Sequence, residues 1–478
     1  MMENEKQLTG REKASYGLGA VGKDMVYMLS ASYILYYFQD IMGVSAAAMG
    51  LILLAARVFD AFNDPIMGVI VAKTRTRWGR FRPWMFFGTL TNAIVLYLMF
   101  SAPPSLDTGG MIAYAAISYV LWGVTYTMMD IPFWSMIPAF TEGGKEREGL
   151  TTLARSCSGV GSALVTIFTM ILVHALGDAF GHGSGSQEVE RVGFQIFALI
   201  VAVLFVIFIA ITCLAIKEKS TVDMETASLG QMFRALISND QAMCVVVTIV
   251  LVNSALYITS NLVLYFFKYD FGGTAWYQSY TGFNMVAGAA QILAMMVLYP
   301  LLRRFVSSIR IFYISLAMSM LGYIILFAIA SLGQNHLALL LIPGVLIMAA
   351  SGMNNVLTTI FLANTVDYGQ LIRGRRDESV IFSMQTFVVK LASGLAALVA
   401  SLALQAFRLS STATRSADQS VDFSAGVSMA SKMGLRMVMT LIPIAGLMIA
   451  FFWFRKKYIL TDARLEEISE QLREKERS

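Results

Sequence analysis

RVFDAFNDPIMG, residues 57–68, places four polar side chains inside an apolar run. The flanking stretches, GVSAAAMGLILLAA before it and GVIVA after it, make the run long enough to span a bilayer. Spacings of three and four put Arg57, Asp60, Asn63 and Asp64 on one helical face. A charged group at mid-membrane costs at least about 2.5–3.5 kcal/mol, so this face needs a partner.

Two carboxylates and an amide on one face offer oxygen ligands, which suit a hard cation or a shared proton. We therefore predict that Asp60, Asn63 and Asp64 bind a coupling cation in the wall of a transport pathway. In the alternative, Arg57 neutralises one aspartate and the cluster only holds two helices together. That alternative accounts for one carboxylate but not for two and an asparagine.

The composition is that of a polytopic membrane protein. Of 478 residues, 57% are hydrophobic and 14% charged, whereas a soluble domain has roughly 25% charged residues. The net charge of +5 lies in short loops and does not indicate nucleic-acid binding. Cys157, Cys213 and Cys244 fall within apolar spans and form no metal or disulfide pattern. The chain has no P-loop, zinc signature or nucleophile elbow, so we expect neither an enzyme nor a cofactor.

Twelve apolar spans predict an all-α membrane protein. They lie at about 16–38, 44–72, 83–102, 111–137, 151–177, 192–216, 241–267, 276–300, 311–332, 337–366, 379–404 and 434–454. Basic residues concentrate in alternate loops, most densely in KTRTRWGRFRP at 73–83, so the positive-inside rule predicts that both termini are cytoplasmic. The polar start, MMENEKQLTGREK, has no apolar core, and we expect no cleaved signal peptide.

The spans divide into two six-helix halves. Residues 217–240 are polar and charged, and they predict a cytoplasmic linker, with a short surface helix over SLGQMFRAL, between an N-terminal half at 1–216 and a C-terminal half at 241–454. Residues 455–478 are charged and helix-prone and predict a cytoplasmic tail helix. Two similar halves around a central cavity are a common transporter plan.

Span four carries the features of a sugar site in WGVTYTMMDIPFWS, residues 122–135. Tyr126, Asp130 and Trp134 share one helical face. Aromatic rings pack against the apolar face of a pyranose, while a carboxylate accepts hydrogen bonds from its hydroxyls. Alternatively, the aromatic residues form an interfacial belt, but a belt needs no buried carboxylate. Thr127 either adds an oxygen to the cation site or bonds a backbone carbonyl.

Span one contributes Lys23 and Asp24 after the glycine-rich lead YGLGAVG. As neighbours on a helix they diverge by about 100°, so both reach one point only at the edge of a cavity. We predict that Asp24 accepts hydrogen bonds from substrate hydroxyls. The alternative places both residues at the membrane surface, in water.

Two basic residues in other spans need explanation. Arg155 opens span five and either donates to hydroxyls, pairs with Asp24 or Asp130, or snorkels to the inner surface. Lys390 lies eleven residues into span eleven, where a buried cation requires an anionic partner. Candidate partners for Lys390 are Asp60, Asp64 and Asp130.

Several motifs together closely resemble those of the melibiose permease group, which belongs to the glycoside–pentoside–hexuronide:cation symporters of the major facilitator superfamily. They are YGLGAVGKD, RVFDAFNDPIMG, TRTRWGRFRPW, YTMMDIPFWS, KEREGLTTLAR, NDQ, NTVDYG and SMQTFVVKLASG. The resemblance runs from about residue 10 to 460 and is most specific in the N-terminal half.

The resemblance implies a twelve-helix major facilitator fold in the plasma membrane that moves a sugar or glycoside with Na⁺, Li⁺ or H⁺ by alternating access. It implies a cation site at Asp60, Asn63, Asp64 and Thr127, and a sugar site at Lys23, Asp24, Tyr126, Asp130, Trp134, Arg155 and Lys390. Asn355 stands where melibiose permeases have a tryptophan, which alters one aromatic wall of the pocket. A lysolipid or other amphiphile carrier on the same fold and a non-transporting membrane sensor are the alternatives.

Overall fold

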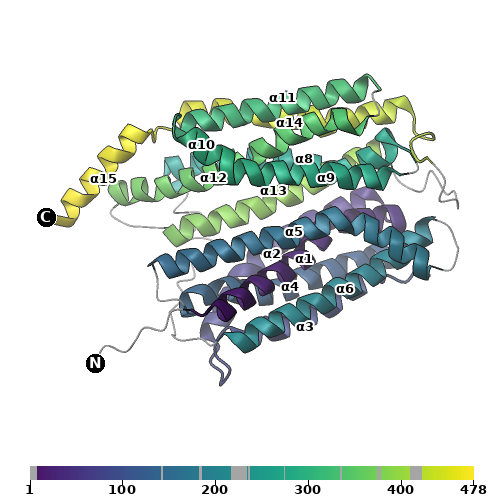
Figure 1. The fold of residues 1–478 in the computed structure, drawn as a ribbon, viewed down its shortest axis with the longest axis horizontal. Helices are drawn as coiled ribbons and strands as arrows, with labels where there is room; N and C mark the ends of the chain where they lie inside the picture. The colour runs from purple at the N-terminus through teal and green to yellow at the C-terminus, as the bar shows by residue number, and fades with distance from the viewer. Residues whose placement is uncertain are drawn as a thin grey trace. The chain divides into compact units, whose positions relative to one another are not determined.

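The computed structural model describes residues 8–140, 144–181, 186–216, 234, 237–273, 275–333, 336–373, 378–409 and 422–477. These residues are almost entirely helical, and within them the β-structure is limited to an isolated bridge between Thr76 and Gly79. The helices belong to two compact units (Figure 1). The first unit contains α1 (Gly10–Tyr36), the π-helix η1 (Tyr37–Ile41), α2 (Ala46–Lys73), α3 (Arg82–Met99), α4 (Thr108–Phe140), α5 (Gly144–Phe180) and α6 (Ser186–Ala215).

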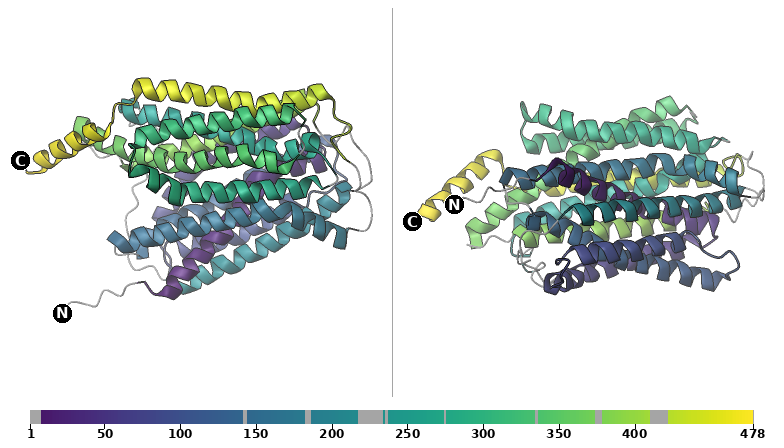
Figure 2. Two further views of the ribbon diagram at one scale, coloured as in Figure 1. Left: turned by 45° about the horizontal axis from the view of Figure 1, so that its top comes forward. Right: turned by 60° about the horizontal axis from the view of Figure 1, so that its bottom comes forward.

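The second unit begins with α8 and ends with a helix rich in charged residues. It contains α8 (Asp240–Phe266), η2 (Phe267–Phe271), α9 (Trp276–Leu293), η3 (Ala294–Leu298), α10 (Tyr299–Arg303), α11 (Ser308–Ser331), α12 (Leu337–Arg373), α13 (Glu378–Ala406), α14 (Met429–Lys457) and α15 (Asp462–Arg477). Figure 2 follows the helices of each unit in two further views.

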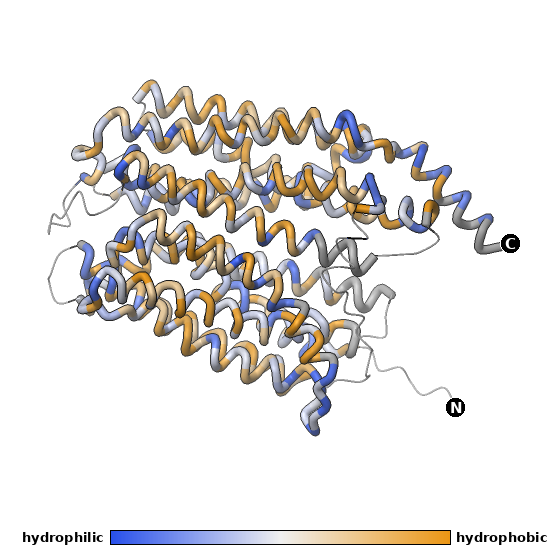
Figure 3. The backbone as a smooth tube through the Cα atoms, turned by 180° about the vertical axis from the view of Figure 1, so that it is seen from behind, coloured by the Kyte–Doolittle hydropathy of each residue, from blue (hydrophilic) through white to orange (hydrophobic). Residues whose placement is uncertain are grey.

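Ten of the described helical stretches are long and apolar enough to cross a membrane. With α1 and α3 they make the twelve predicted spans. The span predicted at 276–300 consists of α9, η3 and α10 in succession, with Pro300 in the first turn of α10. Apolar residues colour most of the helical tube (Figure 3), and large side chains such as Leu214 and Phe452 are 76% and 65% exposed. Such faces suit a lipid solvent.

Sequence signals set several helix starts. The Thr9 hydroxyl accepts from the Glu12 backbone, and the Glu12 carboxylate accepts from the Thr9 backbone, so a capping box begins α1. Ser45 and Asn239 accept from backbone N–H groups at the starts of α2 and α8. The predicted surface helix over residues 228–236 lies outside the described residues, except for Arg234.

Close helix contacts fix the directions of neighbours in the first unit. Gly17 of α1 packs against Cys157 of α5. Four residues further along both helices, a Cβ added at Gly161 would lie 2.3 Å from the Val21 carbonyl oxygen. The paired numbers rise together, so α1 and α5 run parallel. An alanine at 161 would force the two backbones apart, because a Cβ cannot approach an oxygen that closely.

The two units repeat one packing order. In the first unit α1 contacts α5 and α6, α4 contacts α2 and α3, α5 contacts α6, and α3 contacts α6. In the second unit α8 contacts α13 and α14, α12 contacts α9 and α11, α13 contacts α14, and α11 contacts α14. Each unit is therefore the same six-helix arrangement, although the sequence repetition is weak. A π-helix also ends the first long helix of both units, at η1 and η2.

A buried ion pair ties the second unit together. Arg436 of α14 donates from Nε and Nη2 to the two carboxylate oxygens of Asp270 in η2, at 2.7 and 2.6 Å. Both residues are 5% exposed. This bidentate geometry satisfies both charges away from water.

Candidate functional site

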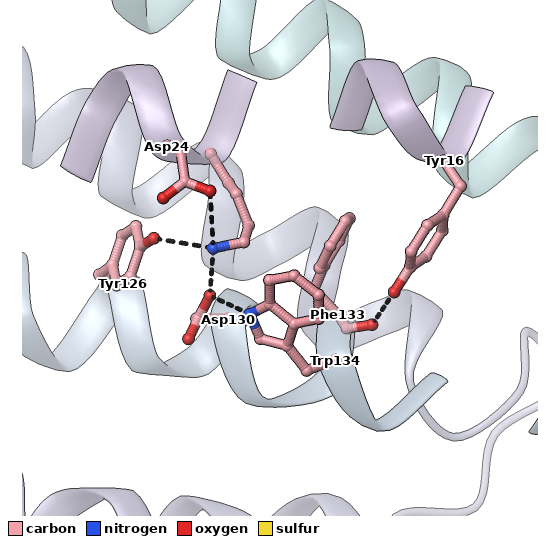
Figure 4. Close-up of polar contacts among 7 residues, drawn as sticks. Tyr16, Asp24, Tyr126, Asp130, Phe133 and Trp134 are labelled. Atoms are coloured by element: carbon pink, nitrogen blue, oxygen red, sulfur yellow. Dashed lines mark hydrogen bonds and ion pairs between the residues drawn. The ribbon is translucent and has the colours of Figure 1, made fainter. Parts of the chain in front are cut away.

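Lys23 is the centre of a polar cluster between α1 and α4 (Figure 4). Its ammonium nitrogen lies 2.7 Å from Asp130 Oδ1 and 3.4 Å from Asp24 Oδ2. It also donates to the Tyr126 hydroxyl at 3.2 Å. The Lys23 side chain is only 4% exposed, so the interpretation of Lys23 as a water-solvated surface residue is wrong. Its flexible stem reaches Asp24 despite the divergence expected for adjacent residues.

Aromatic rings enclose the same cluster. The Trp134 indole N–H donates to Asp130 Oδ1 at 3.2 Å, and Lys23 Nζ lies 5.0 Å from the Trp134 ring centroid. Tyr126 is 9% exposed, so it is buried and does not form a lipid-facing belt. The predicted face of Tyr126, Asp130 and Trp134 is therefore assembled around one ammonium group. The Asp130 and Asp24 side chains are 29% and 16% exposed, although Asp24 Oδ2 itself is buried.

Arg155 makes a different contact from the one expected. Its guanidinium carbon lies 4.1 Å from the Trp134 ring centroid, a stacked cation–π arrangement. Lys23 takes the ion-pair position beside Asp24 and Asp130, so the predicted pairing of Arg155 with either carboxylate is wrong in this structure. The helix also begins at Gly144, eleven residues before Arg155. Arg155 is exposed, so its guanidinium is accessible beside the ring.

Two further tyrosines support the cluster. Tyr16 stacks on Phe133 with ring centroids 4.4 Å apart, and its hydroxyl donates to the Phe133 carbonyl. Tyr27 lies 5.6 Å from Tyr126 by ring centroids. The sequence interpretation missed both residues. Their spacing from Lys23, seven residues before and four after, marks the same face of α1 and is the signal that identifies them.

The polar face of α2 packs against α4. Arg57 and Asp60 are 7% and 6% exposed, and Arg57 Nη1 lies 3.5 Å from Asp60 Oδ2. The Thr127 hydroxyl donates to Asp64 Oδ1 at 3.0 Å. Among the described residues, the buried Asn63 amide nitrogen has no hydrogen-bond partner. Asp60, Asn63, Asp64 and Thr127 thus lie where two helices meet.

Gly123 provides the space in which Asp60 lies. A Cβ added at Gly123 would stand 2.6 Å from Asp60 Oδ1. The two contacts, 60 with 123 and 64 with 127, advance together by one helical turn, so α2 and α4 run parallel here. The sequence interpretation missed Gly123. It lies one turn before Thr127 on the same face of α4, which is the signal that points to it.

Hard oxygen donors dominate this α2–α4 group. Two carboxylates, an amide oxygen and a hydroxyl match the ligands that alkali and other hard cations take. In the part of the chain that the structure describes, no group of three or more His, Cys, Asp and Glu side chains is placed to hold a metal ion. A cation here therefore depends on the Asn63 and Thr127 oxygens as well as on the two acids.

One helix serves both groups. On α4, Thr127 contacts the carboxylate of Asp64, and Tyr126 and Asp130 contact Lys23. Thr127 and Asp130 are three residues apart, less than one turn. A shift of Asp64 toward a bound cation would therefore act on the same turn of α4 that positions Asp130.

The remaining predicted residues lie in the second unit. Lys390 is half-buried on α13, where its backbone carbonyl accepts from Ser393. Asn355 on α12 is exposed and lines a small pocket together with Asn253 and Asn354. The altered aromatic wall of the sugar pocket, inferred at Asn355 from the resemblance, stays a prediction.

Comparisons with known proteins identify the family of the chain. A family model described as MFS/sugar transport protein matches residues 15–462. The putative glycoside/cation symporter YagG of Escherichia coli (strain K12) is 27% identical over 467 residues, which cover 98% of this chain and 95% of YagG. Lactose permease of Lactobacillus delbrueckii subsp. bulgaricus is 28% identical over 485 residues, covering 98% of this chain and 73% of the permease.

Solved structures show the same fold. A bacterial homologue of the human lysosomal transporter Spinster, inward-facing and unoccupied, has a TM-score of 0.64 at 14% identity, covering 94% of this chain and 97% of its own. These matches confirm the resemblance to the glycoside–pentoside–hexuronide:cation symporters. The chain is a multi-pass membrane protein and belongs to the MFS/sugar transport protein family of the major facilitator superfamily.

Proposed function

We propose that this protein is a symporter that couples the movement of a monovalent cation to the uptake of a sugar or glycoside. The observation that carries the proposal is that one turn of α4 contacts both polar groups. Thr127 contacts Asp64 at 3.0 Å, and Asp130, three residues on, contacts Lys23 at 2.7 Å. The names of the relatives, a glycoside/cation symporter and a lactose permease, support the same class of cargo.

The cation is proposed to bind the oxygens of Asp60, Asn63, Asp64 and Thr127. With the site empty, the two acids repel each other, and Arg57 offsets part of the charge of Asp60 at 3.5 Å. A bound Na⁺, Li⁺ or H⁺ removes that repulsion and holds α2 against α4. The Thr127 hydroxyl turns from donating to Asp64 toward offering its oxygen to the cation.

The sugar is proposed to bind on the Lys23 cluster. Its hydroxyls donate to the carboxylates of Asp24 and Asp130, and its apolar ring face packs on Trp134. Arg155, stacked on that indole, donates from its outer edge. Lys23, at 3.4 Å from Asp24 and 2.7 Å from Asp130, offsets the charge of both acids. By linkage, any gain in sugar affinity that the cation provides is returned as a gain in cation affinity.

We also propose how the two halves move and where the chain lies in the cell. Residues 1–216 and 241–454 form the two moving halves, 217–240 link them, and Lys390 contributes to the sugar site from the second half. The chain lies in the plasma membrane with both termini in the cytoplasm. The repeated packing order of the two units supports alternating access by two similar bodies.

Uptake by purified protein in proteoliposomes tests the proposal. With an inward Na⁺ or proton gradient and a panel of labelled sugars, at least one sugar accumulates above its external concentration. Asp60→Asn and Asp64→Asn abolish this accumulation but keep sugar counterflow, which needs no net cation movement. Asp130→Asn abolishes both. Uphill uptake that survives in both Asp60→Asn and Asp64→Asn contradicts the coupling role, and no substrate-driven cation flux with any sugar favours the sensor alternative.

A further inference from the structure

The segment that joins α2 to α3, counted here from the last residue of α2 to the first of α3 as residues 73–82, carries exposed basic residues that the transport mechanism does not use. Lys73, Arg75 and Arg77 are exposed, whereas Arg80 is buried at 7% exposure. In Figure 3 this segment is a mostly hydrophilic loop that extends beyond the ends of the apolar helices. Three accessible positive charges within five residues form a compact surface for an anion.

Hydrogen bonds hold this loop in a defined shape. The Gly79 N–H donates to the Thr76 carbonyl at 3.1 Å, and the Thr76 hydroxyl donates to the Gly79 carbonyl at 2.7 Å. Gly79 has φ of 104°, which a side-chain-bearing residue rarely adopts. Arg77 and Trp78 therefore occupy the two central positions of a tight turn. The Trp84 indole N–H donates to the Thr74 hydroxyl at 2.8 Å and ties the base of the loop to α3.

An aromatic ladder connects the turn to the apolar surface. Trp78 is 51% exposed and meets Phe86 edge-on with centroids 5.9 Å apart, and Phe86 meets Phe87 at 5.7 Å. Phe87 is 56% exposed. Leu90, three residues on from Phe87 along the same face of α3, is 41% exposed, as is Ile70 near the end of α2.

The position along the span defines the environment of the loop. The apolar span of α2 ends at Val71, two residues before Lys73. The basic residues therefore lie at headgroup level, and Phe87 and Ile70 lie at the level of the acyl chains. Tryptophan at such a boundary takes the interfacial position that its amphipathic ring favours.

We propose that the loop at residues 73–82 binds the headgroup of an anionic phospholipid. Arg75 and Arg77 hold the phosphate through their guanidinium forks, Lys73 adds a third charge, and Trp78 packs beside the glycerol backbone. The exposed apolar side chains near the charges fit a lipid, because a soluble acidic partner gains nothing from exposed Phe87, Ile70 and Leu90. The site is separate from the sugar and cation residues.

A second basic cluster provides a matched control. Arg455, Lys456 and Lys457 are exposed at the end of the α14 span, and they equal the loop in charge and in closeness to a span end. They follow one another on a helix, where successive side chains point about 100° apart, whereas Arg75 and Arg77 lie beside and within a turn that hydrogen bonds close. Non-specific attraction to anionic lipid would be the same for both clusters. A specific headgroup site would bind anionic lipid only at residues 73–82.

Fluorescence quenching by brominated lipids tests this proposal in the full chain. The protein is reconstituted in phosphatidylcholine and phosphatidylglycerol, with bromine on one or the other lipid at equal mole fraction. The signal of Trp78 is the difference between wild type and Trp78→Phe. Because a basic residue near an anionic surface is worth about 1 kcal/mol, or roughly fivefold, we expect Trp78 to prefer phosphatidylglycerol by roughly fivefold or more.

The variants give opposite expectations. The triple variant Lys73→Gln, Arg75→Gln, Arg77→Gln lowers the preference to about one, while the triple variant of residues 455–457 to glutamine leaves it unchanged. The proposal is overturned if wild-type Trp78 shows no preference, if neither lipid quenches Trp78, or if the two triple variants lose the preference equally. Near-native circular dichroism of the loop variant confirms that its helices are intact.

Discussion

Gly123→Ala is the sharpest perturbation that the site offers. The substitution adds a single methyl group on α4, and alanine is the better helix former by about 0.8–1.0 kcal/mol. The added Cβ would lie 2.6 Å from Asp60 Oδ1, 3.5 Å from its carboxyl carbon and 3.7 Å from Oδ2. We therefore expect a local effect on one cation ligand rather than a loss of helix.

The size of the effect follows from these distances. Ordinary contact with a Cβ begins at 3.4 Å, so Oδ1 must retreat by about 0.8 Å (3.4 − 2.6). A cation ligand displaced that far leaves the coordination range of a hard cation, which spans only a few tenths of an ångström. Overpacking a close contact costs typically about 1–3 kcal/mol, which corresponds to roughly 5- to 150-fold weaker cation binding.

Cation-activated sugar uptake in proteoliposomes measures this effect. In Gly123→Ala, the cation concentration for half-maximal stimulation rises by that factor, while sugar binding at saturating cation changes by less than threefold. Gly159→Ala on α5 is the matched control, because nothing lies within 4 Å of its added Cβ. Equal activation by cation in Gly123→Ala and wild type, or an equal loss in Gly159→Ala, refutes the assignment of Gly123 as the residue that positions Asp60.

Three further predictions concern single contacts. Thr127→Val removes the hydroxyl that donates to the Asp64 carboxylate at 3.0 Å. The cation concentration for half-maximal uptake should rise about 5- to 10-fold, and Thr127→Ser should restore the wild-type value. Lys23→Gln removes the 2.7 Å partner of Asp130; calorimetric sugar affinity should fall at least about tenfold, and an unchanged affinity contradicts the role of Lys23. Arg436→Gln leaves Asp270 buried without its bidentate partner. The free energy of unfolding in detergent should fall by about 3–5 kcal/mol, and the double variant with Asp270→Asn should recover most of it. Equal losses of stability in the single and double variants argue against an uncompensated charge.

The fold was largely predictable because a membrane imposes strong and local constraints. Each span must satisfy its own backbone hydrogen bonds, so twelve apolar stretches predict twelve helical spans directly. The span at 276–300 was predicted in position but not in form, because the π-turn of η3 breaks the helix without any charged residue to mark it. Residues 217–233 lie outside the described residues, so the linker stays a prediction.

The site was predictable in membership but not in pairing. Buried acids on α2 and α4 are costly, which singles them out in the sequence. Arg155 and Lys390 were the predicted candidate partners for Asp130, and spacing along a helix does not say which distant cation reaches a carboxylate. The structure selects Lys23 at 2.7 Å and stacks Arg155 on Trp134 instead.

The sequence by itself determined the solvent, the number of spans and the identity of the acids that a bilayer does not tolerate without a ligand or a partner. Only the tertiary structure decided that Gly123 receives Asp60, that Tyr16 and Tyr27 support the cluster, and that one turn of α4 contacts both polar groups. The physical reason is that burial cost depends on a residue and its immediate neighbours in sequence, whereas a hydrogen bond or a close contact depends on how α1, α2 and α4 pack.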